Sequence, residues 1–110
     1  MFYGWGANNY GQLGAGFNSE QENQPIRISE PLLSPVRVVG GGGHTLALGG
    51  DGGLFVCGWN RFGQLGLGHT QDVNRFTENS AIRRKVENIQ QIYWSENCTQ
   101  LPFLLFFRTG

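Results

Sequence analysis

The chain has 110 residues, enough for one ordinary domain with a modest core, and eight Lys and Arg residues balance eight Asp and Glu residues. Proteins that bind nucleic acid through phosphate contacts normally carry a basic surface, so this zero formal charge argues against a nucleic-acid partner. The two cysteines, Cys57 and Cys98, do not make a disulfide framework, and no apolar run reaches the roughly 18 residues of a membrane span. Reduced thiols, and the lack of a secretory-signal pattern at the N-terminus, predict an intracellular location in the cytoplasm, the nucleus or both.

The first quarter of the chain has one clear turn region between two short apolar segments. Residues 1–5 are expected to be the end of a strand, and residues 6–16 form a loop rich in Gly and Asn. Residues 17–24 are polar and are expected to be a loop. Residues 25–28 alternate in polarity and are a candidate strand.

Three strands are predicted in the middle of the chain, over residues 36–39, 45–48 and 54–57. The sequence Gly-Gly-Asp-Gly-Gly between the last two predicts a turn that joins them into a hairpin. A fourth strand, near Phe76 or around Ile26, would complete a four-stranded sheet.

The pattern of short apolar runs separated by glycine-rich turns becomes weaker after Thr77. Val86, Ile89 and Ile92 resemble the strand at residues 36–39, but aromatic and polar residues then replace the glycine-rich segment that should follow. The uncharged apolar run at the end of the chain has high β-propensity and is aggregation-prone if exposed. We therefore expect residues 78–110 to be a degenerate repeat start and a divergent, irregular C-terminal tail.

Two stretches of eleven residues, 6–16 and 58–68, have nearly the same sequence, and we call them the first and the second repeat loop. An offset of 52 (58 − 6) aligns them with seven identical positions, and Tyr10 then matches Phe62. A period of this length, rich in Gly and aromatic residues, favours a blade of a β-propeller over a pair of helices. Propellers usually have about four to eight blades. We therefore expect an all-β fold of about two antiparallel blades, one partial and one near-complete, within residues 1–77.

The recurring residues are interpreted as structural. Glycines permit positive φ and close approach of backbones, asparagines bond nearby backbone groups or tolerate a left-handed backbone, and glutamines satisfy unpaired backbone groups. The leucines are expected to fill the space between blades, and His44 to be a scaffold residue rather than a base. The predicted structural motif is Gly6, Asn8, Gly11, Gln12, Leu13, Gly14, His44, Thr45, Asp51, Gly52, Gly58, Asn60, Gly63, Gln64, Leu65 and Gly66.

No catalytic, cofactor-binding or metal site is predicted. The glycine runs lack the Lys of a phosphate-binding loop, and no dinucleotide-binding or nucleophile-elbow sequence occurs. His44 and His69 have no partner at metal-ligand spacing. The basic cluster at residues 83–85 is interpreted as a solvated face, with nuclear import or phosphate binding as the alternative.

The sequence motifs of this chain resemble the repeat of the regulator of chromosome condensation family. The resemblance rests on His44-Thr45-Leu46-Ala47-Leu48, Asp51-Gly52 and the residues from Leu54 to Gly68, and it covers residues 2–77. It implies a propeller of the seven-bladed type, here incomplete. The run 54–77 is most similar to a branch of the family connected with secretion and guanine nucleotide exchange.

The resemblance implies a protein-interaction module related to nucleotide exchange on a Ran-type small GTPase, or to secretion control. The expected partners are proteins, either a small GTPase or a subunit of a trafficking complex. Such exchange is a binding effect and not bond chemistry, so the chain is not expected to be an enzyme, and exchange is not expected of so short a chain. The alternative is a truncated, non-functional fragment, or a purely scaffolding one without exchange activity. Light-sensing relatives have Gly-Trp-Arg-His-Thr where residues 42–45 read Gly-Gly-His-Thr, which disfavours that function.

Overall fold

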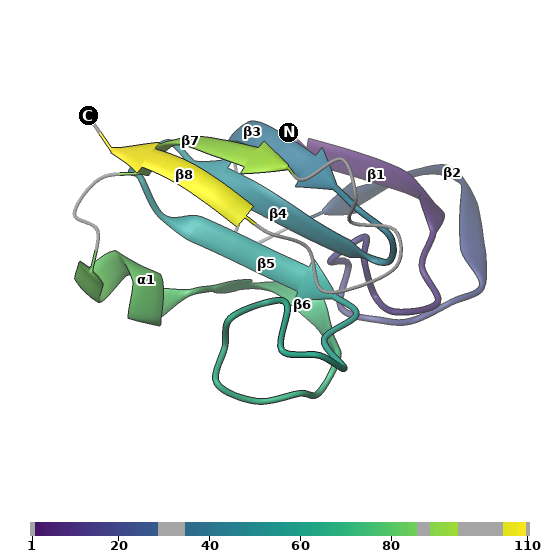
Figure 1. Ribbon diagram of the computed structural model, residues 1–110. Helices are drawn as coiled ribbons and strands as arrows, with labels where there is room; N and C mark the ends of the chain where they lie inside the picture. The colour runs from purple at the N-terminus through teal and green to yellow at the C-terminus, as the bar shows by residue number, and fades with distance from the viewer. Residues whose placement is uncertain (1, 29–34, 86–88, 95–104, 110) are drawn as a thin grey trace.

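A computed structural model describes residues 2–28, 35–85, 89–94 and 105–109. These residues form eight strands in three antiparallel sheets, with one short helix (Figure 1). The expected all-β fold class is confirmed. In chain order the elements are β1 (Phe2–Ala7), β2 (Gln21–Ile28), β3 (Pro35–Gly40), β4 (His44–Gly49), β5 (Leu54–Gly58), β6 (Val73–Glu78), α1 (Ser80–Lys85), β7 (Ile89–Trp94) and β8 (Leu105–Thr109).

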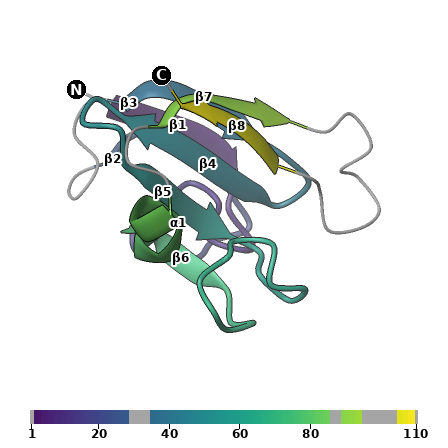
Figure 2. The same ribbon diagram turned by 60° about the vertical axis from the view of Figure 1, so that its left-hand side comes forward.

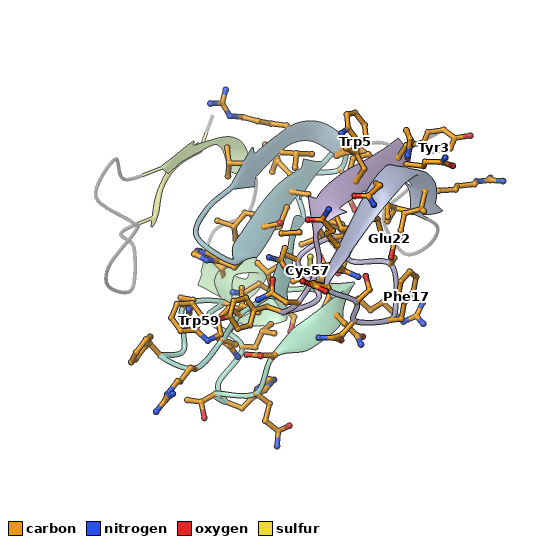
Figure 3. All side chains as sticks on the ribbon, turned by 90° about the vertical axis from the view of Figure 1, so that its right-hand side faces the viewer. Tyr3, Trp5, Phe17, Glu22, Cys57 and Trp59 are labelled. Carbon is orange, nitrogen blue, oxygen red and sulfur yellow. The ribbon has the colours of Figure 1, made fainter. Side chains whose placement is uncertain are left out.

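The sheet β3-β4-β5-β6, which we call the central sheet, lies between two smaller sheets. The sheet β1-β2 lies on one side of it and the sheet β7-β8 on the other (Figure 3). The ring of Phe2 packs against that of Phe76 with centroids 6.0 Å apart, and β7 contacts β3 and β4. The arrangement is that of partial propeller blades: one complete four-stranded blade with half a blade on each side.

The central sheet contains all four strands expected of one blade. The predicted strands at residues 36–39, 45–48 and 54–57 are confirmed as β3, β4 and β5, and the turn at 49–53 joins β4 to β5 as expected. Phe76 lies in β6, which pairs with β5 and completes the sheet. Ile26 lies in β2, which pairs with β1 in a different sheet.

Two regions that were expected to lack secondary structure contain strands or a helix in the structure. Residues 21–24, expected to be loop, belong to β2, because pairing with β1 satisfies their backbone despite their polar side chains. The C-terminal tail, expected to be irregular, contains α1 and the paired strands β7 and β8, while residues 86–88 and 95–104 lie outside the described residues. Asn79 caps α1, since its side-chain oxygen accepts a hydrogen bond from the Ile82 N–H at 3.1 Å.

Helix α1 is short and lies beside β5 (Figure 2). Within the described ranges, no helix has the length and apolar character needed to cross a membrane. The division of the chain at residues 77 and 78 stays a prediction.

The central sheet buries side chains on both faces, because successive residues of a strand point to opposite sides. On one face the second repeat loop inserts Leu65 among side chains of β4 and β5, and this cluster is Leu46, Leu48, Leu54, Val56 and Leu65. The other face packs against the sheet β1-β2 through Ala47, Cys57, Phe76 and Ile28. Burying one such aliphatic or aromatic side chain stabilises the fold by roughly 1.5–3 kcal/mol.

The sequence offset of 52 is also a structural repeat. It relates the first residues of β1 and β5 (54 − 2) and those of β2 and β6 (73 − 21). The pairing of β1 with β2 shifts register between Gly4 and Gly6, and that of β5 with β6 shifts between Val56 and Gly58, which are the same positions one offset later. The half-blade β1-β2 is therefore a second copy of the β5-β6 half of the central sheet.

Candidate interaction surface

Asn8 and Asn60 are equivalent residues (60 − 8 = 52) that hold the two repeat loops closed. Both side chains are 0% exposed, and neither residue has a positive φ. The side-chain oxygen of Asn8 accepts a hydrogen bond from the Leu13 N–H at 3.2 Å, and that of Asn60 from the Leu65 N–H at 3.0 Å. The side-chain bonds, and not a left-handed backbone, thus explain asparagine here. The two amides also donate across the loops, Asn8 to Phe17 O and Ser19 Oγ and Asn60 to His69 O and Gln71 O.

Gln12 and Gln64 repeat a second bond in the two loops. The side-chain oxygen of Gln12 accepts from the Tyr10 N–H, and that of Gln64 from the Phe62 N–H, each at 2.9 Å. The two loops also share their backbone shape. Their equivalent glycines have φ between 69° and 92°, a region that favours glycine, and they are Gly11, Gly14 and Gly16 in the first loop and Gly63, Gly66 and Gly68 in the second.

The first repeat loop is packed between the sheet β1-β2 and the central sheet. The carbonyl oxygen of Gln12 accepts hydrogen bonds from Thr45 Oγ1 at 2.7 Å and from Cys57 Sγ at 3.4 Å. At Gly11 an added Cβ would lie 2.4 Å from the Asn74 Cβ, so only glycine fits. The Gly16 N–H donates to Asn74 O at 2.7 Å. This loop is a spacer between two neighbouring sheets.

The second repeat loop lies on the opposite face of the central sheet and projects away from the strands (Figures 1 and 2). The side-chain amide of Asn79 donates to Leu65 O at 3.1 Å and to Gly66 O at 3.2 Å. At Gly63 and Gly68 an added Cβ would meet nothing within 4 Å. Leu65 is buried, as expected of a residue that fills the space beside a blade, whereas its equivalent Leu13 is half-buried beside Gly4.

The remaining predicted motif residues lie at the ends of β4 and β5. The side chain of Asp51 accepts a hydrogen bond from the Gly53 N–H at 3.0 Å and so shapes the turn that contains Gly52. At Gly58 an added Cβ would lie 2.5 Å from Gly43 O. Gly6 stands at the equivalent position in β1 and also has a positive φ, but open space where a Cβ would be.

The buried titratable groups of the central sheet are held in their neutral forms. His44 is 3% exposed, and burial lowers its pKa to about 4. Burial raises the pKa of the Cys57 thiol to about 12, although the Thr45 hydroxyl acts in the opposite direction. Neither group is an accessible base or nucleophile at neutral pH. Among the described residues, no three His, Cys, Asp or Glu side chains are grouped as metal ligands.

Three aromatic side chains from the two repeat loops form a cluster at the loop end of the central sheet, and we call them the aromatic cluster. Tyr10 stacks on Trp59 with centroids 5.3 Å apart and planes at 27°, and Phe62 meets Trp59 edge-on at 5.4 Å. Phe62 is 51% exposed and the neighbouring Arg61 is also exposed. The offset of 52 aligns Tyr10 with Phe62. It gave no reason to select Trp59, because the equivalent residue in the first loop is Ala7.

The sequence pattern of the regulator of chromosome condensation (RCC1) repeat matches residues 2–48 and 51–99, and a second pattern of this repeat matches residues 36–64. The first match ends and the next begins at the turn between β4 and β5. The second matched region continues past Thr77, into the residues expected to be a degenerate repeat start.

Several known proteins are similar to the chain. The mouse secretion-regulating guanine nucleotide exchange factor is 48% identical over 79 residues, which are 70% of this chain and 17% of that protein. The mouse probable E3 ubiquitin-protein ligase HERC4 is 36% identical over 96 residues, 86% of this chain and 9% of the ligase. The crystal structure of human WBSCR16 superposes with a TM-score of 0.71 at 30% identity, over 82% of this chain and 23% of that one. The chain thus spans less than a quarter of each of these proteins.

Proposed function

Because the chain belongs to the regulator of chromosome condensation repeat family, we propose that it acts as a protein-interaction module of that family. The observation that carries the proposal is the aromatic cluster. Trp, Tyr and Arg are enriched among the few residues that carry most of the binding energy of protein interfaces, and Phe is enriched in the interfaces themselves. Here Tyr10 and Trp59 are fixed by stacking and present the exposed Phe62 beside Arg61.

We propose a small GTPase as the partner, with a subunit of a trafficking complex as the other candidate. The support is the likeness to a protein named as a secretion-regulating guanine nucleotide exchange factor. A module that binds the nucleotide-free form of a GTPase lowers the affinity for nucleotide by linkage, without acid–base chemistry. The proposed setting of such binding is the cytoplasm, the nucleus or both, and its proposed role is the control of secretion.

We further propose that the chain binds its partner without accelerating exchange, and that it is not an enzyme. It spans 17% of the mouse exchange factor, so most of that protein's surface is not represented in these residues. A module of this size presents one loop end, formed by the two repeat loops, to a partner. The competing proposal is a scaffolding fragment whose aromatic cluster has no partner.

A binding and release assay tests these proposals together. Small GTPases, Ran among them, are stripped of nucleotide and titrated with the chain, and in parallel they are loaded with a fluorescent nucleotide whose release is followed. We expect binding to at least one GTPase, with no acceleration of release. Acceleration at high chain concentration would overturn the proposal that exchange is absent, and no binding to any GTPase would overturn the choice of partner.

Matched variants locate the binding surface. Phe62→Ala removes an exposed ring of the aromatic cluster, and we expect it to weaken binding by about tenfold or more. Phe17→Ala removes a ring that is 43% exposed and lies well away from Trp59 (Figure 3), so it serves as the control. Equal affinity of Phe62→Ala and the unchanged chain would contradict the role of the cluster and favour the scaffolding fragment.

A further inference from the structure

The chain contains one complete interface between two repeat units. We use this interface as a template with which the equivalent surfaces elsewhere in the chain are compared. On one side lie the first repeat loop and β2, and on the other lies the face of the central sheet formed by Ala47, Cys57 and Phe76. The contacts include the Gln12 carbonyl with Cys57 and the close approach of Gly14 to Phe76, where an added Cβ would lie 2.3 Å from the ring.

One side of this template recurs, uncovered, on the sheet β1-β2. Trp5 is the equivalent of Cys57 (57 − 52 = 5), yet Trp5 is 63% exposed whereas Cys57 is 0% exposed. In β2, Asn23 and Gln24 are the equivalents of Arg75 and Phe76, and both are exposed. Trp5 points outward from β1 at the edge of the molecule (Figure 3). We call this surface, formed by Trp5, Asn23 and Gln24, the acceptor face.

The other side of the template recurs on the second repeat loop. Gly63 and Gly68 are the equivalents of Gly11 and Gly16, with φ of 73° and 86° against 79° and 92°. Gly11 and Gly16 approach Asn74 and Arg75 closely, whereas the space beside Gly63 and Gly68 is open. The second loop therefore has the shape of the packed first loop without its neighbour among the described residues.

We propose that these two surfaces bind each other between two copies of this chain, the second repeat loop of one copy lying on the acceptor face of the next. The Gln64 carbonyl then faces Trp5, whose indole N–H is a stronger donor than the Cys57 thiol that faces Gln12. Trp5 is larger than Cys57, and the smaller Asn23 and Gln24 in place of Arg75 and Phe76 together leave space for it. Phe62, the equivalent of Tyr10, lies over Ala7, the equivalent of Trp59.

The strand count fits the same arrangement. Among the residues that the structure describes, the sheet β7-β8 has two strands where the central sheet has four, and β1 has one paired edge where its equivalent β5 has two. In the proposed contact, β1 and β2 of the second copy lie beside β8 as β5 and β6 lie beside β4. The contact joins two different surfaces, so copies associate head to tail, either in a closed ring or in an open series.

Sedimentation velocity over a range of concentrations tests the proposal. We expect the unchanged chain to self-associate and Trp5→Glu, which alters the acceptor face, to raise the dissociation constant by about tenfold or more. Trp5→Gln is the milder second variant, and circular dichroism verifies that each variant is folded. Phe17→Glu places the same charge at an exposed ring outside both surfaces, and we expect it to associate as the unchanged chain does.

A mixing experiment distinguishes head-to-tail binding from other modes. Phe62→Glu alters the loop side and leaves the acceptor face intact, whereas Trp5→Glu does the reverse. At a concentration where the unchanged chain associates, each variant alone is expected to be mainly monomeric, and an equal mixture is expected to give a one-to-one complex through the one intact pair of surfaces. The proposal is overturned if the unchanged chain is monomeric throughout, if both variants associate as strongly as the unchanged chain, or if the mixture stays monomeric. These outcomes do not depend on any GTPase, so they are separable from the proposed function.

Discussion

The hydroxyl of Thr45 donates a hydrogen bond of 2.7 Å to the backbone carbonyl of Gln12, across 33 residues of sequence. Gln12 lies in the first repeat loop and Thr45 in β4, so this bond joins two successive repeat units. The same carbonyl accepts from the buried Cys57. Because the Gln12 carbonyl oxygen accepts hydrogen bonds from both β4 and β5, it fixes the position of the first repeat loop on the central sheet.

Replacing Thr45 by Val removes this donor and leaves the Gln12 carbonyl with the weaker thiol. We expect the free energy of unfolding to fall by about 1–2 kcal/mol, the usual consequence of leaving a buried acceptor poorly satisfied. Urea denaturation followed by tryptophan fluorescence measures the change. Thr77→Val is the control, because the exposed Thr77 hydroxyl bonds only within its own strand, to Arg75 O. A loss as large for Thr77→Val as for Thr45→Val would contradict the special role of the Gln12 contact.

Gly11 and Gly63 form a matched pair that separates backbone conformation from close packing. Their φ values are 79° and 73°, but only Gly11 has a neighbour, the backbone and Cβ of Asn74. Substitution by Ala is expected to destabilise both sites by about 1–2 kcal/mol because of the left-handed backbone. Overpacking should add roughly 1–3 kcal/mol at Gly11 alone. Unfolding free energies, measured at concentrations where the chain is monomeric, should therefore differ between the variants, and equal losses would show that Gly11 is not packed against β6.

Asn60 is predicted to be essential for the second repeat loop. Its buried side chain bonds the Leu65 N–H and two carbonyl groups across the loop, so Asn60→Ala leaves several polar groups unsatisfied. We expect a loss of about 3 kcal/mol, with faster amide exchange at Leu65. Asn9 is exposed, and Asn9→Ala should change stability by less than about 0.5 kcal/mol. If Asn60→Ala and Asn9→Ala are equally stable, the hydrogen-bond assignment in this loop is wrong.

The stability of the chain is predicted to fall in mild acid because of His44. Burial lowers the folded-state pKa of His44 from 6.5 to about 4, so the unfolded chain takes up a proton at a higher pH than the folded one. The contribution of neutral His44 is fully present above pH 6.5 and is lost as the pH falls to about 4, with a magnitude on the order of 2 kcal/mol.

Variants isolate this effect from the titration of carboxylates. Urea denaturation at several pH values should show a smaller drop in stability between neutral and mildly acidic pH for His44→Gln than for the unchanged chain. His69 is exposed, and His69→Gln should keep the full drop. An undiminished pH dependence in His44→Gln would contradict the assignment to His44.

The sequence predicted the central sheet well, because β3, β4 and β5 are short apolar runs bounded by glycines, and residue pattern alone indicates such strands. It did not predict the polar half of β2, whose strand conformation depends on its pairing with β1. Nor did it predict α1, which is too short for helical periodicity and begins at the cap formed by Asn79. Local pattern therefore fails where a non-local partner or a single cap decides the conformation.

The repeated residues themselves were easier to find than the surfaces they form. The offset of 52 identified Asn8, Asn60 and the glycines from identity alone. Trp59 was not singled out, because its importance comes from stacking on Tyr10, a residue of the other loop. The Gln12 carbonyl is a backbone atom and carries no sequence signal at all. Both features become visible only when two repeat units are placed side by side.

The two repeat loops have the same backbone shape, but the first is packed against a neighbouring sheet at Gly11 and Gly16, whereas the second is open at the equivalent Gly63 and Gly68. Amide hydrogen exchange, measured by NMR on the monomeric chain, tests this difference most directly. The Gly16 N–H, which donates to Asn74 O at 2.7 Å, should be protected, whereas the N–H of its exposed equivalent, Gly68, should exchange rapidly. Equal protection of the two amides, or faster exchange at Gly16, would contradict the account.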